Sequence, residues 1–364
     1  MRRVTIVGCG VVGAMIAYEL SQLPDLKICV LDRQPPAQGA TGAALGVLMG
    51  IISHKVKGRN WRLRETSLRR YETLIPELED TLGRSLPFNR QGILNLCFDP
   101  EELPRWESLQ QIRQTQGYPL EIWSAEQTAT ACPHLNLRGV AAAIYSPQDR
   151  QIDPAALTLA LVEAAQLRGV RFHFDRQVNG LQPHDSHSLI VETPEESLVS
   201  DIVILASGTG SSSLTQSLNQ SVPIGPVLGQ ALQVKLTAPL GQIDFQPVVN
   251  GNDIHLVPLG GGSYWIGATV EFPTDADPSW VLGLKLEEER LEAVRQGAIA
   301  FCPALAEATV TKTWFGLRPR PQGQPAPVIT QLPGHPQVWV ASGHYRNGVL
   351  LAPATALYLQ EKLG

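Results

Sequence analysis

The sequence predicts an α/β protein in which a parallel sheet built from both ends of the chain is joined to a second, antiparallel sheet. Three observations predict this. A short strand, a glycine-rich turn and a helix open the chain at residues 4–23. A buried strand at residues 201–206 runs into another glycine- and serine-rich turn. Residues 86–145 and 222–321 show short strand patterns interrupted by proline and glycine.

The first glycine-rich turn has the spacing of a dinucleotide site. After a β-branched strand, Gly8, Gly10 and Gly13 form G-x-G-x-x-G, and helical spacing follows. Gly8 permits the tight turn, Gly10 has no Cβ to keep a pyrophosphate away, and Gly13 lets the helix pack closely on the strand. The N–H groups at the helix N-terminus favour phosphate charge. The alternative is a unit of the same shape that binds no nucleotide.

An acidic residue follows the next predicted strand, residues 27–31. Asp32 stands nineteen positions after Gly13, where a carboxylate can accept hydrogen bonds from both hydroxyl groups of an adenosine ribose. The adjacent Arg33 is included among the cofactor-binding candidates. Strand, turn, helix, strand and terminal acid therefore occur in the order that predicts a Rossmann-type domain.

Small residues dominate the next stretch, Gly39-Ala-Thr-Gly-Ala-Ala-Leu-Gly46. Such a run lets the backbone lie against a flat or charged ligand, with Thr41 free to bond a phosphate. The alternative is a tightly packed helix–helix contact. A long amphipathic helix is then expected over residues 59–82. We expect its arginines to form a solvated face, as charge runs usually do: Arg59, Arg62, Arg64, Arg69 and Arg70.

The remaining pattern predicts two interleaved domains. Asp153-Pro154 is typical of a capped helix start. Other helices are expected at 100–115, 124–131, 155–168, 284–301 and 349–363. Strands are expected at 92–98, 140–145, 170–174, 177–181, 189–192, 229–236, 254–258, 264–270, 311–317 and 337–341. We predict a discontinuous nucleotide-binding domain at 1–85, 147–221 and 322–364, and a second domain at 86–146 and 222–321.

Composition excludes several classes of protein. The net charge of −5 argues against nucleic acid as the main partner. The five cysteines are scattered without a C-x-x-C pair, which favours a reducing compartment and argues against a disulfide framework or a metal site. The apolar run at 42–52 is too short for a transmembrane segment, and no signal peptide is recognised. We therefore expect a cytoplasmic enzyme with a small-molecule substrate, and a homo-oligomer is left open.

Several motifs together resemble a known family. These are the N-terminal V-T-I-V-G-C-G-V-V-G, then G-A-T-G-A-A-L-G, I-D-P-A-A-L, P-V-L-G-Q, W-I-G-A-T-V-E, T-W-F-G-L-R-P and G-H-Y-R-N-G-V-L-L-A-P. In this order they resemble the D-amino-acid-oxidase-like FAD-dependent oxidoreductases, most of all the glycine oxidase branch. The resemblance spans essentially the whole chain and implies FAD held without a covalent bond.

The resemblance also implies which residues hold FAD. Gly8, Gly10 and Gly13 would hold the pyrophosphate, and Asp32 the adenosine ribose. The other implied contacts are Thr41, Ala44 and Gly46 along the phosphates and ring system, Val178 at the adenine, Ser207, Gly208 and Gly210 closing the site, and Gly343, His344, Arg346, Asn347 and Gly348 at the pyrimidine edge of the flavin.

Members of this family oxidise the C–N bond of an amine by hydride transfer to the flavin. Arg318, in G-L-R-P, matches the arginine that binds the substrate carboxylate. Its alternative is a surface arginine in a salt bridge. Arg346 would lie near the flavin or the substrate, or else satisfy loop carbonyl groups. His344 is interpreted as a hydrogen-bonding scaffold rather than a proton shuttle.

Two positions depart from the family pattern. His255 stands where related glycine oxidases carry a tyrosine at the substrate face, and it is the third candidate catalytic residue beside Arg318 and Arg346. A histidine there would hydrogen-bond the substrate carboxylate or admit a bulkier, more acidic substrate, which puts glycine itself in doubt. Trp265 stands where the sarcosine oxidase branch carries a lysine that promotes the reaction with oxygen. An FAD-dependent amino-acid dehydrogenase with another electron acceptor is therefore an alternative. A flavoprotein that serves as an assembly or partner-binding factor is a second, and an NAD-dependent dehydrogenase is a third.

Overall fold

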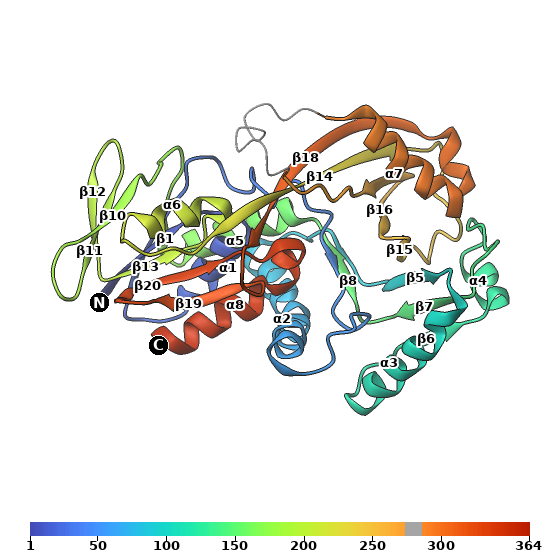
Figure 1. Cartoon of the computed structure of the whole chain (residues 1–364), viewed down its shortest axis with the longest axis horizontal. Coiled ribbons are helices and arrows are strands. Elements are labelled where there is room, and N and C mark those ends of the chain that lie inside the picture. Colours follow the sequence, from blue (N-terminus) through green and yellow to red (C-terminus); the bar gives the residue numbers. More distant parts are fainter. Residues whose placement is uncertain (274–285) are drawn as a thin grey trace.

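The computed structural model describes residues 1–273 and 286–364. The chain forms two lobes, and both termini lie in the left-hand lobe of Figure 1. Two long neighbouring strands, β14 (Ile224–Lys235) and β18 (Thr309–Pro321), run from this lobe into the other one (Figure 1). They pair antiparallel along most of their length. A continuous two-stranded ribbon therefore connects the lobes.

A six-stranded sheet forms the core of the left-hand lobe. Its central strand, β1 (Arg2–Val7), pairs parallel with β2 (Leu26–Leu31) and with β13 (Ile202–Leu205). The outer strands are β9 (Arg171–His173), β20 (His335–Ser342) and the antiparallel edge strand β19 (Val328–Leu332). The C-terminal strand β20 thus lies two places from the N-terminal strand. This parallel sheet confirms the predicted α/β class.

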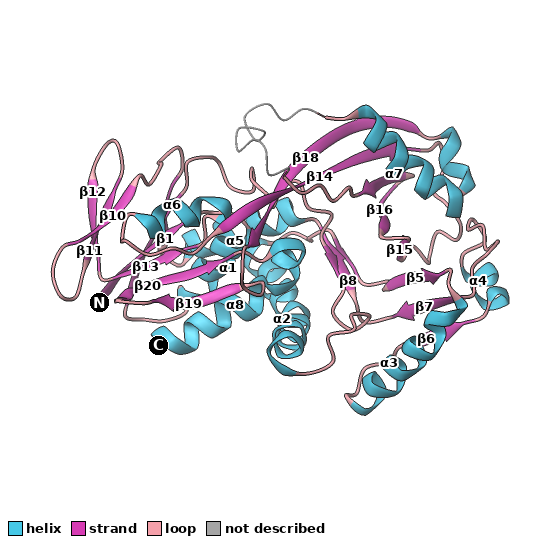
Figure 2. Cartoon of the chain, in the orientation of Figure 1, coloured by secondary structure: helices cyan, strands magenta, loops and turns pink. Residues whose placement is uncertain are grey.

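Helices cover one face of this sheet, and a small sheet covers the other. The long helices of this lobe lie together on one side (Figure 2): α1 (Val11–Leu20), α2 (Gly58–Leu82), α5 (Pro154–Leu167) and α8 (Gly348–Leu363). They share one apolar core with β1. On the opposite face, Leu181 and Val191 pack with Val203 and Val340. They belong to the antiparallel sheet of β10 (Gly180–Pro183), β11 (Leu189–Glu192) and β12 (Ser197–Ser200).

An eight-stranded sheet forms the second lobe, and helix α7 (Glu288–Phe301) packs against it. Its strand order is β18-β14-β17-β16-β15-β5-β7-β6. The strands not yet given are β5 (Ile93–Cys97), β6 (Glu121–Trp123), β7 (Ala142–Ser146), β15 (Val248–Gly251), β16 (Ile254–Gly260) and β17 (Ser263–Gly267). Two further helices flank it, α3 (Leu103–Thr115) and α4 (Ala125–Ala131).

One pairing in this sheet differs from the predicted antiparallel arrangement. Strands β5 and β15 pair parallel, with Ile93 opposite Val248. They come from the two separate stretches of chain that build this lobe, so no hairpin connects them. Every other neighbouring pair in the sheet is antiparallel.

Three short strands link the lobes near their junction. Strand β8 (Arg150–Ile152) pairs antiparallel with both β3 (Val47–Leu48) and β4 (Phe88–Asn89). The predicted cap of the helix that follows β8 is confirmed. Asp153 accepts hydrogen bonds from the backbone N–H groups of Ala155 and Ala156, at 2.8 and 3.0 Å.

Some predicted boundaries are wrong. The first strand of the hairpin predicted at 177–181 begins only at Gly180, because the backbone N–H of Arg176 donates to the carbonyl of Asp32 at 2.8 Å. This bond keeps residues 176–178 beside β2. The helix predicted at 284–301 begins at Glu288, and residues 284–285 lie outside the described residues.

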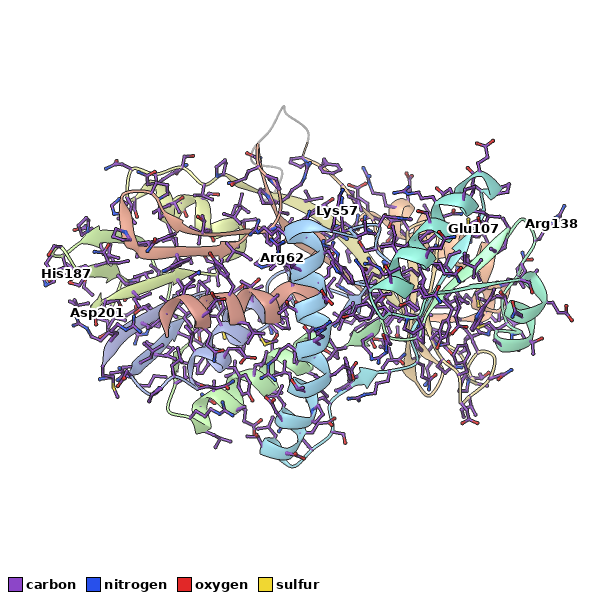
Figure 3. The ribbon with its side chains drawn as sticks, turned by 90° about the horizontal axis from the view of Figure 1, so that it is seen from below. Lys57, Arg62, Glu107, Arg138, His187 and Asp201 are labelled. Carbon is purple, nitrogen blue, oxygen red and sulfur yellow. The ribbon has the colours of Figure 1, made fainter. Side chains whose placement is uncertain are left out.

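The predicted solvated arginine face of α2 is wrong in part. Arg62 and Arg69 are exposed, and Figure 3 shows Arg62 near the start of the helix. Arg64 is buried. Arg70 is largely covered and binds the carboxylates of Glu19 and Glu77, each at 2.7 Å. Two of these arginine side chains, Arg64 and Arg70, therefore point into the protein interior and not into solvent.

None of the helices within residues 1–273 and 286–364 combines the length and apolar composition needed to cross a membrane. In the same ranges no group of three or more His, Cys, Asp or Glu side chains is placed to hold a metal ion. All five cysteines are free.

Candidate functional site

A cavity of about 650 Å³ lies at the carboxyl ends of β1 and β13 and extends to β16 and β18. The predicted catalytic residues Arg318, Arg346 and His255 all line it. So do most of the predicted cofactor-binding residues: Gly8, Gly10, Asp32, Arg33, Thr41, Ala44, Gly46, Val178, Ser207, Gly208, Gly210, Gly343, His344 and Gly348. Gly13 and Asn347 do not line the cavity.

The three glycines of the first turn have different surroundings. Gly8 has a φ of +106°, and a Cβ there would lie 2.6 Å from the carbonyl oxygen of Ala206. A Cβ on Gly13 would collide with the carbonyl oxygen of Gly8, which explains why Gly13 is needed although it does not reach the cavity. At Gly10 a Cβ would meet only Thr41, with Oγ1 at 3.0 Å. Gly10 therefore leaves the space that a pyrophosphate requires.

The N-terminus of α1 faces this space without a side-chain cap of its own. The N–H of Val11 donates to Thr41 Oγ1 at 3.0 Å. Thr41 was expected to be free for a phosphate, but its oxygen already holds the small-residue stretch against α1, and only its hydroxyl hydrogen remains to be donated. The amide dipoles at the start of α1 still favour an anion.

Asp32 is held in place at the end of β2. Its Oδ2 accepts from the N–H of Cys9 at 2.6 Å, and its Oδ1 accepts from the N–H of Gln34 at 2.9 Å. Each carboxylate oxygen keeps further lone-pair capacity. A fixed carboxylate beside a helix N-terminus and an open glycine turn fits the adenosine and pyrophosphate of a dinucleotide cofactor.

The second glycine-rich turn is joined to the C-terminal loop. Ser342 Oγ donates to the carbonyl oxygen of Gly208 at 3.0 Å. Gly343 has a φ of +67°, and a Cβ there would lie 2.6 Å from the ring of Pro321. Chain segments more than 130 residues apart thus meet at one wall of the cavity.

His344 has the surroundings of a scaffold residue. Its side chain is buried, and its Nε2 lies 2.9 Å from Thr355 Oγ1. The hydroxyl of Thr355 donates to the carbonyl oxygen of Leu351 at 2.8 Å, so His344 Nε2 is the donor in the first bond. Burial lowers the pKa of His344 to about 3, and the ring is therefore neutral at pH 7.

Arg318 faces the cavity from β18. Its Nη1 and Nη2 each donate at 3.0 Å, to the carbonyl oxygens of Leu228 and Thr269. The guanidinium group lies so close over Gly229 that no Cβ would fit there. Within the described residues Arg318 forms no salt bridge, which disfavours the surface alternative. A guanidinium group has five N–H donors, so three remain for an anionic ligand.

Arg346 binds a carboxylate and not the loop carbonyl groups that the alternative required. Its two Nη atoms donate to Asp253 at 2.6 and 2.9 Å. Asp253 lies in the turn between β15 and β16, so this ion pair joins the C-terminal loop to the second lobe. The carboxylate of Asp253 raises the pKa of Arg346, which stays charged.

His255 lies on β16 and lines the cavity together with these two arginines. It is half-buried, and its Nδ1 is shielded from solvent and has no hydrogen-bond partner among residues 1–273 and 286–364. Burial lowers the pKa of His255 to about 4, with the charges of Arg346 and Arg318 acting in the same direction. The side chain is a neutral hydrogen-bonding group at pH 7.

Trp265 does not line the cavity. Its Nε1 donates to Gln233 Oε1 at 3.1 Å, and its ring centre lies 6.0 Å from that of Trp314. Trp314 in turn donates to the carbonyl oxygen of Ala43, which does line the cavity. The two tryptophans thus form part of the wall behind the small-residue stretch.

Sequence reasoning missed four polar residues at or near the site. Arg64 lies 3.4 Å from Asn347 Oδ1, and it follows the spacing of the buried residues Trp61, Leu68 and Tyr71, a signal that was available. Arg176 lines the cavity beside Val178. The side chain of Asp253 meets Arg346, which is 93 positions away, and the buried Glu271, the last residue of W-I-G-A-T-V-E, meets Gln230, which is 41 positions away. The linear sequence gives no signal for these contacts.

Comparisons with known proteins agree on one family. The family described as FAD dependent oxidoreductase, DAO, matches residues 3–362. The chain is 29% identical over 363 residues to a glycine oxidase from Pseudomonas aeruginosa, covering 99% of this chain and 94% of that protein. It is 29% identical to the bifunctional protein ThiO/ThiG from Trichormus variabilis, covering 99% of this chain and 52% of that protein. The crystal structure of glycine oxidase from Geobacillus kaustophilus superposes with a TM-score of 0.88 at 26% identity, covering 100% and 95% of the two chains.

Proposed function

Because the chain belongs to the DAO family of FAD dependent oxidoreductases, we propose that it oxidises the C–N bond of a small amino acid, with Arg318 binding the substrate carboxylate. Family membership confirms the resemblance predicted from the motifs and the expected cofactor, FAD. Relatives named glycine oxidase support an amino-acid substrate. The NAD-dependent alternative is thereby excluded.

The residues that would hold FAD are those that form the open turns. Gly8 and Gly10 leave room for the pyrophosphate, the start of α1 attracts its charge, and Asp32 accepts from the ribose hydroxyl groups. FAD bound by these residues would supply the acceptor for a hydride from the carbon next to the amine nitrogen. The C-terminal loop at Gly343 and His344 closes the other end of the same cavity.

The substrate end combines a cation with a neutral polar group. Arg318 presents free N–H donors in the planar geometry that matches a carboxylate. The neutral imidazole of His255 offers a further hydrogen bond without adding charge. With the carboxylate held at Arg318, the amine carbon is oriented within the cavity, and orientation is the main contribution that the protein makes to such a reaction.

The observation that carries this proposal is that Arg318 lines the same cavity as the glycine turns. The test is anaerobic reduction of the FAD-loaded protein by a panel containing glycine, N-methylglycine and D-amino acids, read as bleaching of flavin absorbance. Bleaching by at least one amino acid is expected. Retention of FAD without bleaching by any of them would contradict the amino-acid substrate and leave the cofactor in place. Reoxidation with oxygen or a quinone then identifies the electron acceptor.

We also propose the domain division 1–85, 147–221 and 322–364 against 86–146 and 222–321. It is supported by the two large sheets, since their strands fall on those segments. A cytoplasmic location is proposed from the five free cysteines. A homo-oligomer is proposed as a state to be measured by analytical ultracentrifugation.

A further inference from the structure

Glu271 has a buried carboxylate close to the site. The proposed reaction does not require this carboxylate. Its Oε1 accepts from Gln230 Nε2 at 3.0 Å and from Thr269 Oγ1 at 2.5 Å. Its Oε2 lies 3.5 Å from Arg290 Nε, which is half-exposed. Burying a charge is costly unless it is well satisfied. The position of this carboxylate therefore calls for a reason beyond filling space.

The two residues whose carbonyl oxygens bind Arg318 also form hydrogen bonds with Glu271. Arg318 donates to the carbonyl oxygens of Leu228, on β14, and of Thr269, after β17. Leu228 and Glu271 exchange two backbone hydrogen bonds, at 2.9 and 3.0 Å. Both acceptors of Arg318 thus lie on backbone that Glu271 contacts directly or through one side chain.

The hydroxyl of Thr269 connects Gln230 on β14 with the carboxylate of Glu271. It accepts from the N–H of Gln230 at 2.8 Å while donating to Glu271, and the N–H of Thr269 donates to the carbonyl of Gln230 at 3.1 Å. Gln230 is fully buried and also accepts from the N–H of Glu287 at 2.8 Å. The polar bonds therefore fix the segment 269–271 against β14.

We propose that Glu271 is a positioning residue for substrate binding, which fixes the two carbonyl oxygens that orient the guanidinium group of Arg318. The inference rests on the proposed function, in which Arg318 binds a carboxylate. A bidentate contact needs the guanidinium plane to be held, and the two inward bonds from Nη1 and Nη2 set that plane. Without the Glu271 carboxylate, Thr269 loses the acceptor of its hydroxyl, and the segment 269–271 is held against β14 mainly by its backbone hydrogen bonds.

The test uses acetate as the carboxylate probe, titrated into FAD-loaded protein and read from the flavin absorbance without turnover. Glu271→Ala and Thr269→Val are expected to weaken acetate binding about tenfold, because small misplacements of a binding group have large effects. Thr269→Ser keeps the hydroxyl and is the matched control, expected to stay within about twofold. Arg290→Gln removes only a half-exposed partner and is expected to change little.

Kinetics provide a second readout. With an amino acid that reduces the flavin, Glu271→Ala should raise the half-saturating concentration while the limiting rate of anaerobic reduction changes by less than about threefold. A folded, FAD-loaded Glu271→Ala variant that binds acetate like the wild type would overturn the proposal. A Thr269→Ser variant that binds acetate more weakly than Thr269→Val would also overturn it. If Glu271→Ala does not fold, the comparison of these two Thr269 variants tests the proposal.

Arg318→Lys separates this inference from the function on which it rests. If acetate does not bind the wild type, or binds Arg318→Lys equally well, the proposed role of Arg318 fails. If Arg318→Lys weakens acetate binding and Thr269→Val does not, only the role of Glu271 fails.

Discussion

The guanidinium group of Arg346 donates two hydrogen bonds to the carboxylate of Asp253, at 2.6 and 2.9 Å. Arg346 belongs to the loop after β20, and Asp253 to the β15–β16 turn of the other lobe. The pair therefore bridges the two lobes beside the cavity that Arg346 and Arg318 line. The carboxylate of Asp253 also compensates the charge of Arg346, one of the two arginines that line the cavity. This compensation reduces the attraction of the cavity for an anionic substrate.

Replacing Asp253 by Asn should strengthen the binding of a carboxylate. The substitution removes a negative charge two residues from His255, while the amide can still accept one hydrogen bond from Arg346. Acetate affinity of the FAD-loaded protein is expected to rise about threefold at low salt, and the gain should shrink at 1 M salt, where charges are screened beyond about 3 Å. Asp244→Asn, at an exposed position that does not line the cavity, is the control. Weaker acetate binding would show that Asp253 instead keeps Arg346 in its binding position.

Replacing Arg318 by Ala should weaken amino-acid binding by about 2–5 kcal/mol, the usual loss for one partner of a buried charge pair. Arg318→Lys should recover only part of this, because a lysine cannot reach the carbonyl oxygens of Leu228 and Thr269 together. The measurement is the substrate dependence of anaerobic flavin reduction. An amine without a carboxylate, such as ethylmethylamine, is the control. An equal loss for that amine would contradict carboxylate binding by Arg318.

The dinucleotide cradle was predictable because it is local. Gly8, Gly10 and Gly13 lie within six residues of one another, Gly8 has a φ of +106°, and a Cβ on Gly13 would meet the carbonyl oxygen of Gly8. The cap at Asp153 was predictable for the same reason. Arg64 shows a limit of composition alone, because a run of arginines predicts an exposed face, whereas the spacing of Arg64 from Trp61 and Leu68 places it on the buried face of α2.

The contacts of Glu271 show what could not be predicted, although the residue itself ends the motif W-I-G-A-T-V-E. Its neighbour Gln230 is 41 positions away, and the two meet only because β14 and the segment after β17 lie side by side. The parallel pairing of β5 with β15 is of the same kind, because it joins two separate stretches of chain. Such features follow from strand order, which no pattern within one segment determines.

Two glycine variants should separate FAD binding from folding. At Gly13 an added Cβ collides with the backbone of Gly8, so Gly13→Ala should lower the free energy of unfolding by about 1–3 kcal/mol or more. At Gly10 the nearest atom is Thr41 Oγ1 at 3.0 Å, so Gly10→Ala should leave the stability of FAD-free protein within about 1 kcal/mol. It should nevertheless weaken FAD binding by at least about tenfold, or 1.4 kcal/mol.

Urea unfolding of the FAD-free proteins measures the free energy of unfolding. Titration with FAD, monitored by the quenching of FAD fluorescence, measures FAD affinity. Normal FAD affinity in Gly10→Ala would show that the pyrophosphate does not approach the backbone at this turn.

Acid should destabilise the protein through its buried histidines. The pKa of His344 is lowered to about 3 by burial, and those of His255 and His134 to about 4, against an ordinary value near 6.5. Between these values the unfolded chain binds protons that the folded chain does not, so stability present near neutral pH is lost as the pH falls below 6.5. Each such histidine contributes about 1.4 kcal/mol per pH unit in that range.

His344→Gln should therefore flatten the dependence of unfolding free energy on pH between 6 and 4 by about 1.4 kcal/mol per unit. The glutamine amide can still donate to Thr355, which limits the loss of stability near neutral pH. Urea unfolding at a series of pH values gives the pH dependence of the unfolding free energy for the wild type and for His344→Gln. His134→Gln should also flatten this dependence, and it should not change FAD affinity, since His134 does not line the cavity. Parallel curves for the wild type and His344→Gln would mean that His344 becomes protonated in the folded protein, and its interpretation as a neutral scaffold would be wrong.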